Sequence, residues 1–372
     1  MQKKLRIATF NVSMETSNYP VEGKSIFQAS RLTEVLKEGK QTQVRNIAEI
    51  IQRVRPDIIL LNEFDYIENE EDGIGLFVKQ YLQQSQNGQE AINYPYIYID
   101  SVNTGIETGL SGKDNRLRHF GFGRYPGQYG MALLSKYPIE KNQVRTFQKF
   151  LWKDMPENLL PMDKSGKSWY SDDEVNIMRL SSKSHWDIPI NIDGKLISIL
   201  ASHPTPPVFD GPEDRNGRRN HDEIRFWKDY IAGDKNSYHY DDVQQKGGIA
   251  KNRGFVILGD LNASAIEGDA YPGTMNQLLE HPAINDYPAP TSDGGSLNKA
   301  ESPYAKSHTA AWGMRADYVL PSKGLKLIDS GVFWPKPDSK EAYLVADRNA
   351  SSDHRLVWVD IENPNFISCP TR

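Results

Sequence analysis

The run Phe255-Val256-Ile257-Leu258-Gly259-Asp260-Leu261-Asn262 indicates the fold more clearly than any other stretch of this chain. Short apolar runs bounded by Gly and Asp are typical of strands buried on both faces. Asp260 follows such a run directly, and a carboxylate there is costly to bury unless it binds something. The run therefore predicts a buried strand that ends in a functional site. With Asp260 and Asn262 two residues apart on an extended segment, both side chains are expected on one side, where they can hold one phosphate or water.

Other apolar runs end in, or open with, polar residues in the same way. Residues 5–10 and 58–61 are two such runs, 196–200 and 356–359 are two more, and all are predicted to be strands. Their flanking polar groups span almost the whole chain, so one sheet system must gather them, and residues 1–372 are predicted to form a single domain. The strand-end groups are Asn11, Glu63, His203, Asp260, Asn262, Asp317, Asp353 and His354.

Composition narrows the class of protein. The chain has 372 residues, of which 38% are hydrophobic and 25% charged, enough for a sizeable core, and length alone allows two domains. A net charge of −5 argues against a broadly basic nucleic-acid footprint. Cys369 is the only cysteine, so neither an intrachain disulfide nor a cysteine-based metal site is expected.

No run of 18 or more apolar residues is present, so no membrane span is expected. Met1-Gln2-Lys3-Lys4 leaves no room for a signal peptide before the first strand, although a chain trimmed of its leader looks the same. The compartment stays open: secreted or periplasmic if a leader has been removed, and cytoplasmic otherwise. A monomer is expected.

Two amphipathic helices are predicted between the strands. Apolar residues at helical spacing over 44–54 indicate the first, which Pro56 ends. Asn220 and Glu223 have the spacing of an N-cap and its partner and predict a second helix up to Gly233. Strands alternating with helices and hairpins favour a mixed α/β protein with sheets inside. Long polar segments, predicted to be functional loops or disordered insertions, cover 65–75, 100–128, 152–182, 204–222, 234–252 and 287–311.

Taken together, the motifs resemble the endonuclease/exonuclease/phosphatase superfamily, which includes pancreatic-type deoxyribonucleases, apurinic endonucleases, sphingomyelinases and inositol polyphosphate 5-phosphatases. The resemblance covers essentially the whole chain, and its specificity lies in the number and order of the motifs. They are Thr9-Phe10-Asn11, Leu61-Asn62-Glu63-Phe64-Asp65, Gly130-Met131-Ala132-Leu133-Leu134-Ser135, Ser202-His203-Pro204, Leu258-Gly259-Asp260-Leu261-Asn262, Arg315-Ala316-Asp317-Tyr318 and Ser352-Asp353-His354.

The resemblance implies a fold and a chemistry. The fold is an α/β (α+β) four-layer α/β/β/α sandwich of two mixed sheets flanked by helices, with the site at one edge. The chemistry is hydrolysis of a phosphoester with Mg²⁺, or Mn²⁺ or Ca²⁺ in its place. Carried over by motif, the metal is held by Glu63 with Asn11 and Asp353 close to it, Asp260 and Asn262 orient the water and a phosphoryl oxygen, Asp317 holds His354, and His354 and His203 act on the phosphate from either side. Either Asp260 or His354 is the general base.

The loops favour a small-molecule, lipid or sugar phosphate as substrate, because they do not match DNA-gripping elements of the nucleases. Arg215, Arg218 and Arg219 are either solvated or clamp a substrate phosphate. His185 is interpreted first as a core-edge residue hydrogen-bonded to Asp187 and second as a substrate contact. The leading hypothesis is a metal-dependent phosphatase or phosphodiesterase. The alternatives are a non-specific metal-dependent nuclease and a non-catalytic protein that binds a phosphoester.

Overall fold

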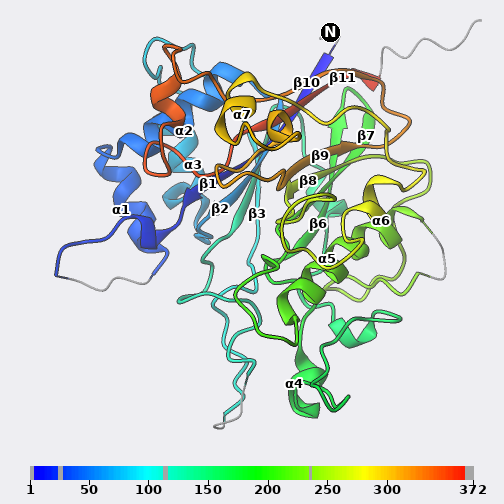
Figure 1. The fold of residues 1–372 in the computed structure, drawn as a ribbon. Coiled ribbons are helices and arrows are strands. Elements are labelled where there is room, and N and C mark those ends of the chain that lie inside the picture. Colours follow the sequence, from blue (N-terminus) through cyan, green and yellow to red (C-terminus); the bar gives the residue numbers. More distant parts are fainter. Residues whose placement is uncertain (1–3, 24–27, 112–115, 234–236, 365–372) are drawn as a thin grey trace, which may run out of the picture.

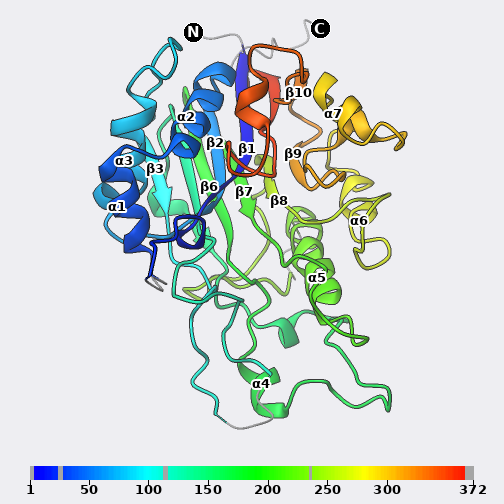
Figure 2. The same ribbon diagram turned by 60° about the vertical axis from the view of Figure 1, so that its left-hand side comes forward.

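The computed structural model describes residues 4–23, 28–111, 116–233 and 237–364, which form two β-sheets packed face to face with helices outside them (Figures 1 and 2). The first sheet has the order β10-β11-β1-β2-β4-β3, and the second has the order β5-β6-β7-β8-β9. The strands are β1 (Lys4–Met14), β2 (Ile58–Phe64), β3 (Tyr96–Ile99), β4 (Met131–Ser135), β5 (Arg145–Thr146), β6 (His185–Ile192), β7 (Lys195–Ser202), β8 (Gly254–Asp260), β9 (Asp317–Pro321), β10 (Leu327–Val332) and β11 (Val357–Glu362).

Both sheets are mixed. β1 pairs in parallel with β2 and antiparallel with β11, whereas β7 pairs in parallel with β8 and antiparallel with β6. The helices are α1 (Ser30–Glu38), α2 (Thr42–Val54), α3 (Ile74–Phe77), α4 (Asp172–Ile177), α5 (Arg215–Ile231), α6 (Asn276–Leu279) and α7 (Asp293–Asn298). Short 3-10 turns cover Thr16–Asn18, Glu70–Asp72, Lys141–Gln143, Trp152–Asp154, Ala305–Ser307 and Ala342–Val345, and a π-helical turn covers Val78–Leu82.

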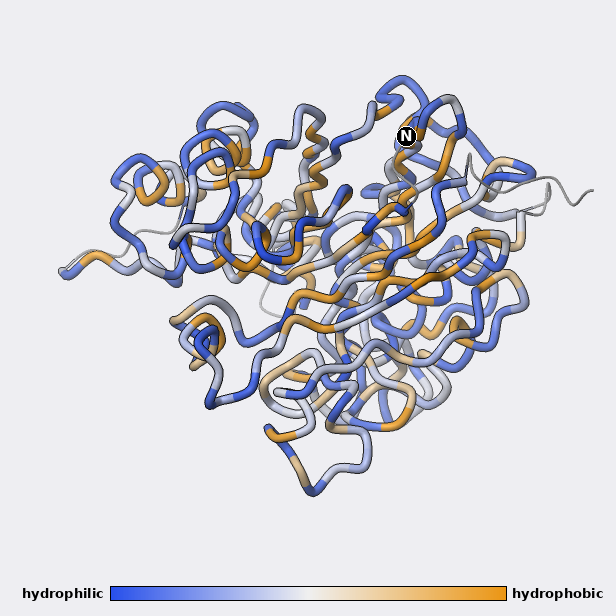
Figure 3. Tube along the Cα trace, turned by 90° about the horizontal axis from the view of Figure 1, so that it is seen from above, coloured by the Kyte–Doolittle hydropathy of each residue, from blue (hydrophilic) through white to orange (hydrophobic). Residues whose placement is uncertain are grey.

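The strands alternate their side chains between two apolar layers. In β8, Val256 and Leu258 belong to the core between the sheets, whereas Phe255 and Ile257 pack into a second core under α5. This period of two is the geometry of a strand buried on both faces. α1, α2 and α3 lie outside the first sheet and α5 outside the second, and apolar residues concentrate along the central strands while many peripheral loops are polar (Figures 1 and 3). The predicted four-layer sandwich is confirmed.

The first predicted helix is confirmed, because α2 spans Thr42–Val54. The predicted start of the second helix is wrong: α5 begins at Arg215, and Asn220 lies within it. Asn220 is buried and donates its side-chain N–H to the carbonyls of Thr205 and Leu261, at 2.8 and 2.9 Å. The polar pair that resembles a cap therefore braces loops next to the helix.

Several segments predicted to be long loops contain helical turns. Residues 215–222 belong to α5, and α4 and α7 lie within 152–182 and 287–311. Residues 100–111, residues 116–128 and α4 extend from the sandwich at the end away from the N-terminus (Figures 1 and 2). No helix among the described residues is long and apolar enough to cross a membrane. Cys369 lies outside the described residues.

A glycine allows β7 and β8 to approach each other just before the polar cluster. Gly259 has a φ of +150°, and a Cβ atom placed there would lie 2.0 Å from the carbonyl oxygen of Ser202, the last residue of β7. Only glycine satisfies both conditions. Gly259 therefore sets the distance between the strand ends that carry His203 and Asp260.

We predict that Gly259→Ala lowers the free energy of unfolding by on the order of 3 kcal/mol, because the added methyl group collides with backbone that cannot move aside. The matched control is Gly254→Ala in the same strand, where the nearest atom to the new Cβ lies at 3.5 Å. It should change the free energy by less than about 1 kcal/mol. Urea denaturation of both variants measures the difference, and equal losses would refute this role of Gly259.

Candidate active site

The described part of the chain brings strand-end polar groups from both sheets together around Asp260. The carboxylate of Asp260, only 1% exposed, accepts a 3.0 Å hydrogen bond from Nδ2 of Asn11 at its Oδ2. Its Oδ1 accepts a 3.0 Å bond from the backbone N–H of Asn262, and its own backbone N–H donates to Oδ1 of Asn62 at 3.1 Å. Asn11 and Asn62 come from the first sheet and Asp260 from the second, so this network joins the two sheets.

Two histidines face the same oxygen of Asp260. Nε2 of His203 lies 3.4 Å from Oδ2 of Asp260, and Nε2 of His354 lies 3.5 Å from it. On the far side of its ring, Nδ1 of His354 lies 2.9 Å from Oδ2 of Asp317. Thr309 donates its hydroxyl to that oxygen at 2.7 Å. The arrangement is a buried chain of carboxylate, imidazole and carboxylate.

The charges in this chain set its protonation. Burial alone would lower the pKa of His354, but the adjacent carboxylates of Asp317 and Asp260 raise it to about 10. Burial raises the pKa of Asp317. Burial would also raise the pKa of Asp260, but the neighbouring imidazoles and Asn11 together hold it well below its usual range. The favoured state is an imidazolium at His354 between two carboxylates.

Glu63 takes an unusual backbone conformation at the end of β2. Its φ is +56°, and the register between β1 and β2 shifts between Asn11 and Met14, across from this residue. Non-glycine residues adopt such conformations at a cost, and they cluster at functional sites. The side chain of Asn11 lies near the Glu63 carboxylate and lowers its pKa. Burial, with a smaller contribution from the charges of Asp260 and Asp353, raises the pKa of Glu63 to about 6 against the opposing effect of His354 and Asn11.

Asp353 lies at the edge of the cluster. The hydroxyl of Ser13 donates to its Oδ1 at 3.4 Å, and Nε of Arg348 lies 3.9 Å from its Oδ2. Its side chain is 29% exposed, far more than that of Asp260. Asp353 therefore offers an oxygen atom that water or a ligand can reach.

A family model described as "Endonuclease/Exonuclease/phosphatase family" matches residues 8–354. The chain belongs to this family. Members of the family are metal-dependent phosphoester hydrolases. The match extends from β1 to His354 and so includes every strand end that contributes to the cluster. A search of curated proteins found no match.

Several solved structures are similar to this chain at low sequence identity. An endonuclease/exonuclease/phosphatase from Beutenbergia cavernae is 15% identical with a TM-score of 0.51, over 97% of this chain and 72% of that one. A family protein from Leptotrichia buccalis is 16% identical with a TM-score of 0.48, over 96% and 99% of the two chains. Sphingomyelinase C from Streptomyces griseocarneus is 14% identical with a TM-score of 0.46, over 96% and 99%.

One predicted geometry within the family pattern is wrong. Asp260 and Asn262 do not project from one extended segment, because β8 ends at Asp260 and Asn262 has a φ of +54°. Asp260 instead accepts the backbone N–H of Asn262, as in a turn formed by an aspartate side chain. Nδ2 of Asn262 donates to the carbonyl of Pro204 at 3.1 Å, which ties this turn to the loop after His203.

His185 lies in the core rather than at the site. It is 1% exposed, packs against Phe226 and Trp227, and does not bond to Asp187 as predicted. Its Nε2 lies 2.8 Å from the backbone carbonyl of Glu223, and since a carbonyl only accepts, Nε2 carries the proton. Its position gives no support to the alternative of a substrate contact.

The three arginines do not form a clamp. Arg219 is 7% exposed, and its guanidinium donates to the carbonyls of Leu180, Phe120 and Arg179 at 2.6 to 2.8 Å. Arg215 is bound by Glu213 and the carbonyl of Phe209. Arg218 lies over the ring of Tyr271, 5.3 Å from its centroid. These contacts make Arg219 a brace for the loops before β6.

Three residues of the site are not predicted by the sequence. Thr309 orients Asp317, and half-exposed Trp312 packs edge-on against His354 with ring centroids 4.9 Å apart. Lys183 is 5% exposed, and its charge acts on Glu63 and Asp260. Each lies in a polar segment without apolar periodicity, so the sequence contains no signal that separates it from a surface residue.

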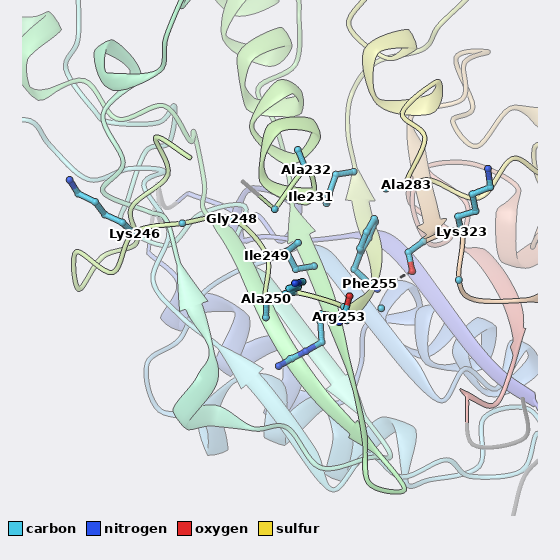
Figure 4. A pocket seen from close by; sticks show the side chains of 17 residues that line it. Ile231, Ala232, Lys246, Gly248, Ile249, Ala250, Arg253, Phe255, Ala283 and Lys323 are labelled. Atoms are coloured by element: carbon cyan, nitrogen blue, oxygen red, sulfur yellow. Dashed lines mark hydrogen bonds between the residues drawn. The ribbon is translucent and has the colours of Figure 1, made fainter. Parts of the chain in front are cut away.

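A separate hollow of about 910 Å³ lies at the other end of β8 (Figure 4). Ile231, Ile249 and Phe255 form part of its wall, and Lys251 and Lys323 stand among the polar residues around it. Its lining contains no carboxylate or imidazole that might carry acid–base chemistry. The candidate active site is therefore the cluster around Asp260.

The buried state of His185 predicts a pH dependence. Burial lowers the pKa of His185 to about 4, below the unfolded value of about 6.5. The unfolded state therefore binds a proton that the folded state does not, and this contribution to stability falls as the pH drops from about 6.5 to 4.

We predict that His185→Gln reduces the slope of unfolding free energy against pH over this window by up to about 1.4 kcal/mol per pH unit. Gln retains a donor for the Glu223 carbonyl. His239→Gln should act similarly, because burial lowers the pKa of His239 to about 4 as well. Urea denaturation at several pH values measures the slopes, and curves parallel to wild type would contradict the assignment.

Proposed function

We propose that the chain hydrolyses a phosphate ester with the help of a divalent cation, by direct attack of a water molecule on phosphorus. The observation that carries this proposal is the placement of Asp260 between two histidines, with Nε2 of His203 at 3.4 Å and Nε2 of His354 at 3.5 Å. A water molecule bound to Asp260 would have this carboxylate as its proton acceptor. The imidazoles of His354 and His203 would offer hydrogen-bond donors near the phosphorus atom.

Glu63 and Asp353 would hold the cation. Both are oxygen ligands, as Mg²⁺ prefers, and too few to enclose it, which leaves positions for water and substrate. The neighbouring carboxylate of Asp260 adds negative charge at this place, which a cation would offset. When bound, the ion supplies positive charge that neutralises the phosphoryl oxygens. Mg²⁺ fits best, and Mn²⁺ or Ca²⁺ can replace it.

Asn11 would position Asp260 and Glu63 rather than hold the metal. Its Nδ2 donates to Asp260, and its Oδ1 accepts the backbone N–H of Ser13 at 3.1 Å. The amide thus has both ends engaged. It fixes the Asp260 carboxylate relative to the bulge in β1.

Asp260, Asp317 and His354 form the one group of acids and histidines among the described residues whose ligand atoms all lie within 4.8 Å of one another. We assign this group to proton chemistry instead of metal binding. His354 is held as an imidazolium by its two carboxylates, and an imidazolium has no free nitrogen lone pair for a cation. Its Nδ1 is already engaged by Asp317.

Asp260 would act as the general base. It remains ionised at neutral pH, whereas His354 already carries its proton. In the reaction, a proton moves from the attacking water to Asp260, the water oxygen bonds to phosphorus, and the bond to the leaving oxygen breaks. The leaving oxygen then takes up a proton from solvent water. Nε2–H of the His354 imidazolium stabilises the charge that develops on the phosphoryl oxygens. His203 is neutral, because burial lowers its pKa to about 4, and it holds Asp260 from the other side.

Aromatic side chains near the site favour a substrate that carries an apolar or sugar group. Trp312 packs against His354 and is 48% exposed. Phe122, 75% exposed, stacks on Tyr129, and the charge of Glu63 acts on Tyr129. Exposed aromatic rings can pack against the apolar or sugar part of a small-molecule, lipid or sugar phosphate. Nuclease activity is the second candidate, since an exposed aromatic ring also stacks on a base.

We predict that hydrolysis of p-nitrophenyl phosphate or bis(p-nitrophenyl) phosphate requires Mg²⁺ or Mn²⁺ and stops in chelator. Glu63→Gln, Asp260→Asn and His354→Gln should each lower kcat about 10²- to 10⁴-fold. The matched control is Asp360→Asn, a buried carboxylate paired with Arg6 at 2.6 Å, toward the other end of β1. It should keep the wild-type rate.

A panel of nucleotides, sugar phosphates, inositol phosphates, phospholipids and plasmid DNA identifies the substrate class. Cleavage of DNA that declines steeply with salt would favour the nuclease alternative. Binding without turnover across the panel, in the presence of Mg²⁺ and Mn²⁺, would show a non-catalytic protein instead.

A further inference from the structure

Lys183 is a buried cation without a partner at the edge of the active site. Its residue is 5% exposed, and its ammonium makes no hydrogen bond or ion pair with any residue in the described ranges. A buried ammonium is costly unless it is paired. Such a position without a partner in the described chain points to a partner that is not part of the chain.

The surrounding segments fix Lys183 near His203. Lys183 lies two residues before β6, and His185 at the start of β6 pairs with Ser202 of β7. The hydroxyl of Ser182 donates to the carbonyl of His203 at 3.4 Å, and the carbonyl of Lys183 accepts the N–H of Asn103 at 2.9 Å. The backbone on both sides of the lysine is therefore held.

The carboxylates near Lys183 are engaged elsewhere. The side chain of Glu223 accepts the backbone N–H groups of Ser182 and Thr205, each at 2.6 Å. Asp260 is surrounded by Asn11 and two histidines. Burial lowers the pKa of Lys183, and these negative charges act on the ammonium from a distance and oppose part of that effect.

Nδ1 of His203 is also buried without a hydrogen-bond partner among the described residues. The charge of Lys183 reaches this ring, since it contributes to the lowered pKa of His203. Nε2 of the neutral His203 ring faces Asp260, so its Nδ1 is an acceptor. Of the two groups, the ammonium of Lys183 is the one that can bind an anion.

We propose that the ammonium of Lys183 binds a nonbridging oxygen of the substrate phosphoryl group. This inference rests on the proposed function and adds a positioning charge from outside the family motifs of this chain. The divalent cation that Glu63 and Asp353 would hold supplies positive charge to the phosphoryl group. The ammonium of Lys183 would supply further positive charge from the protein itself. A fixed cation of this kind stabilises the charge that develops in the transition state.

The test compares full-length Lys183→Met with wild type in the presence of Mg²⁺. We expect kcat/KM for the aryl phosphate that wild type hydrolyses to fall about 100-fold. Inhibition by inorganic phosphate should weaken by a similar factor. The melting temperature should stay the same or rise, because the substitution removes an unpaired buried charge.

Lys136→Met is the matched control, because Nζ of Lys136 lies 3.0 Å from Asp57 just beyond the end of β4, away from the candidate site. It should keep both kcat/KM and phosphate inhibition. If Lys183→Met does not fold, Lys183→Gln repeats the measurement with a smaller change in polarity.

Unchanged kcat/KM and unchanged phosphate inhibition in Lys183→Met would overturn the proposal. A fall in melting temperature with wild-type phosphate inhibition would also overturn it, since that outcome marks a structural role. Absence of metal-dependent turnover in wild type would instead count against the proposed function. In that case, calorimetric titration with inorganic phosphate still tests Lys183, because loss of binding in Lys183→Met alone supports the proposal and equal binding refutes it.

Discussion

The burial of the Asp260 carboxylate is the constraint on which the rest of this structure depends. An ionised carboxylate with 1% exposure costs several kcal/mol unless hydrogen bonds and opposite charges offset it. Asn11, the backbone N–H of Asn262, and the imidazoles of His203 and His354 supply these interactions. Asn62 adds a link to the first sheet, because it accepts the backbone N–H of Asp260. The same contacts join the two sheets at one end of the sandwich. The interactions that offset the cost of burying the carboxylate therefore also gather the polar side chains of the candidate site.

Irregular backbone conformations occur where the functional groups approach Asp260. Glu63 has a left-handed conformation opposite the bulge in β1, near Asn11. At Gly259, close contact with the Ser202 carbonyl sets the separation of β7 and β8. The Glu63 conformation costs energy, and such conformations cluster at functional sites. Regular strands thus form most of the two sheets, and the irregular positions lie where the polar side chains meet.

The strands and their terminal polar groups are predictable from sequence, because an apolar run that stops at a carboxylate or amide is typical of a buried strand whose end meets a polar site. Residues whose role depends on tertiary partners are not. Asn220 has the spacing of a helix cap but bonds to two loop carbonyls. Arg219 resembles a solvated or phosphate-binding residue but donates to four backbone carbonyls. Lys183 stands in a serine-rich approach to β6, where only the fold reveals its burial. The order of the motifs along the sequence indicates the family. It does not indicate the substrate, because the loops that contact a substrate show no hydrophobic periodicity.

Anomalous diffraction from crystals soaked in Mn²⁺ tests the central claim most directly. We expect a peak about 2.1 Å from a carboxylate oxygen of Glu63, with Asp353 on the same side and His354 outside the coordination sphere. A peak seated among Asp260, Asp317 and His354 would contradict the assignment of that group to proton chemistry. No peak near any of these residues would contradict the metal-dependent mechanism itself.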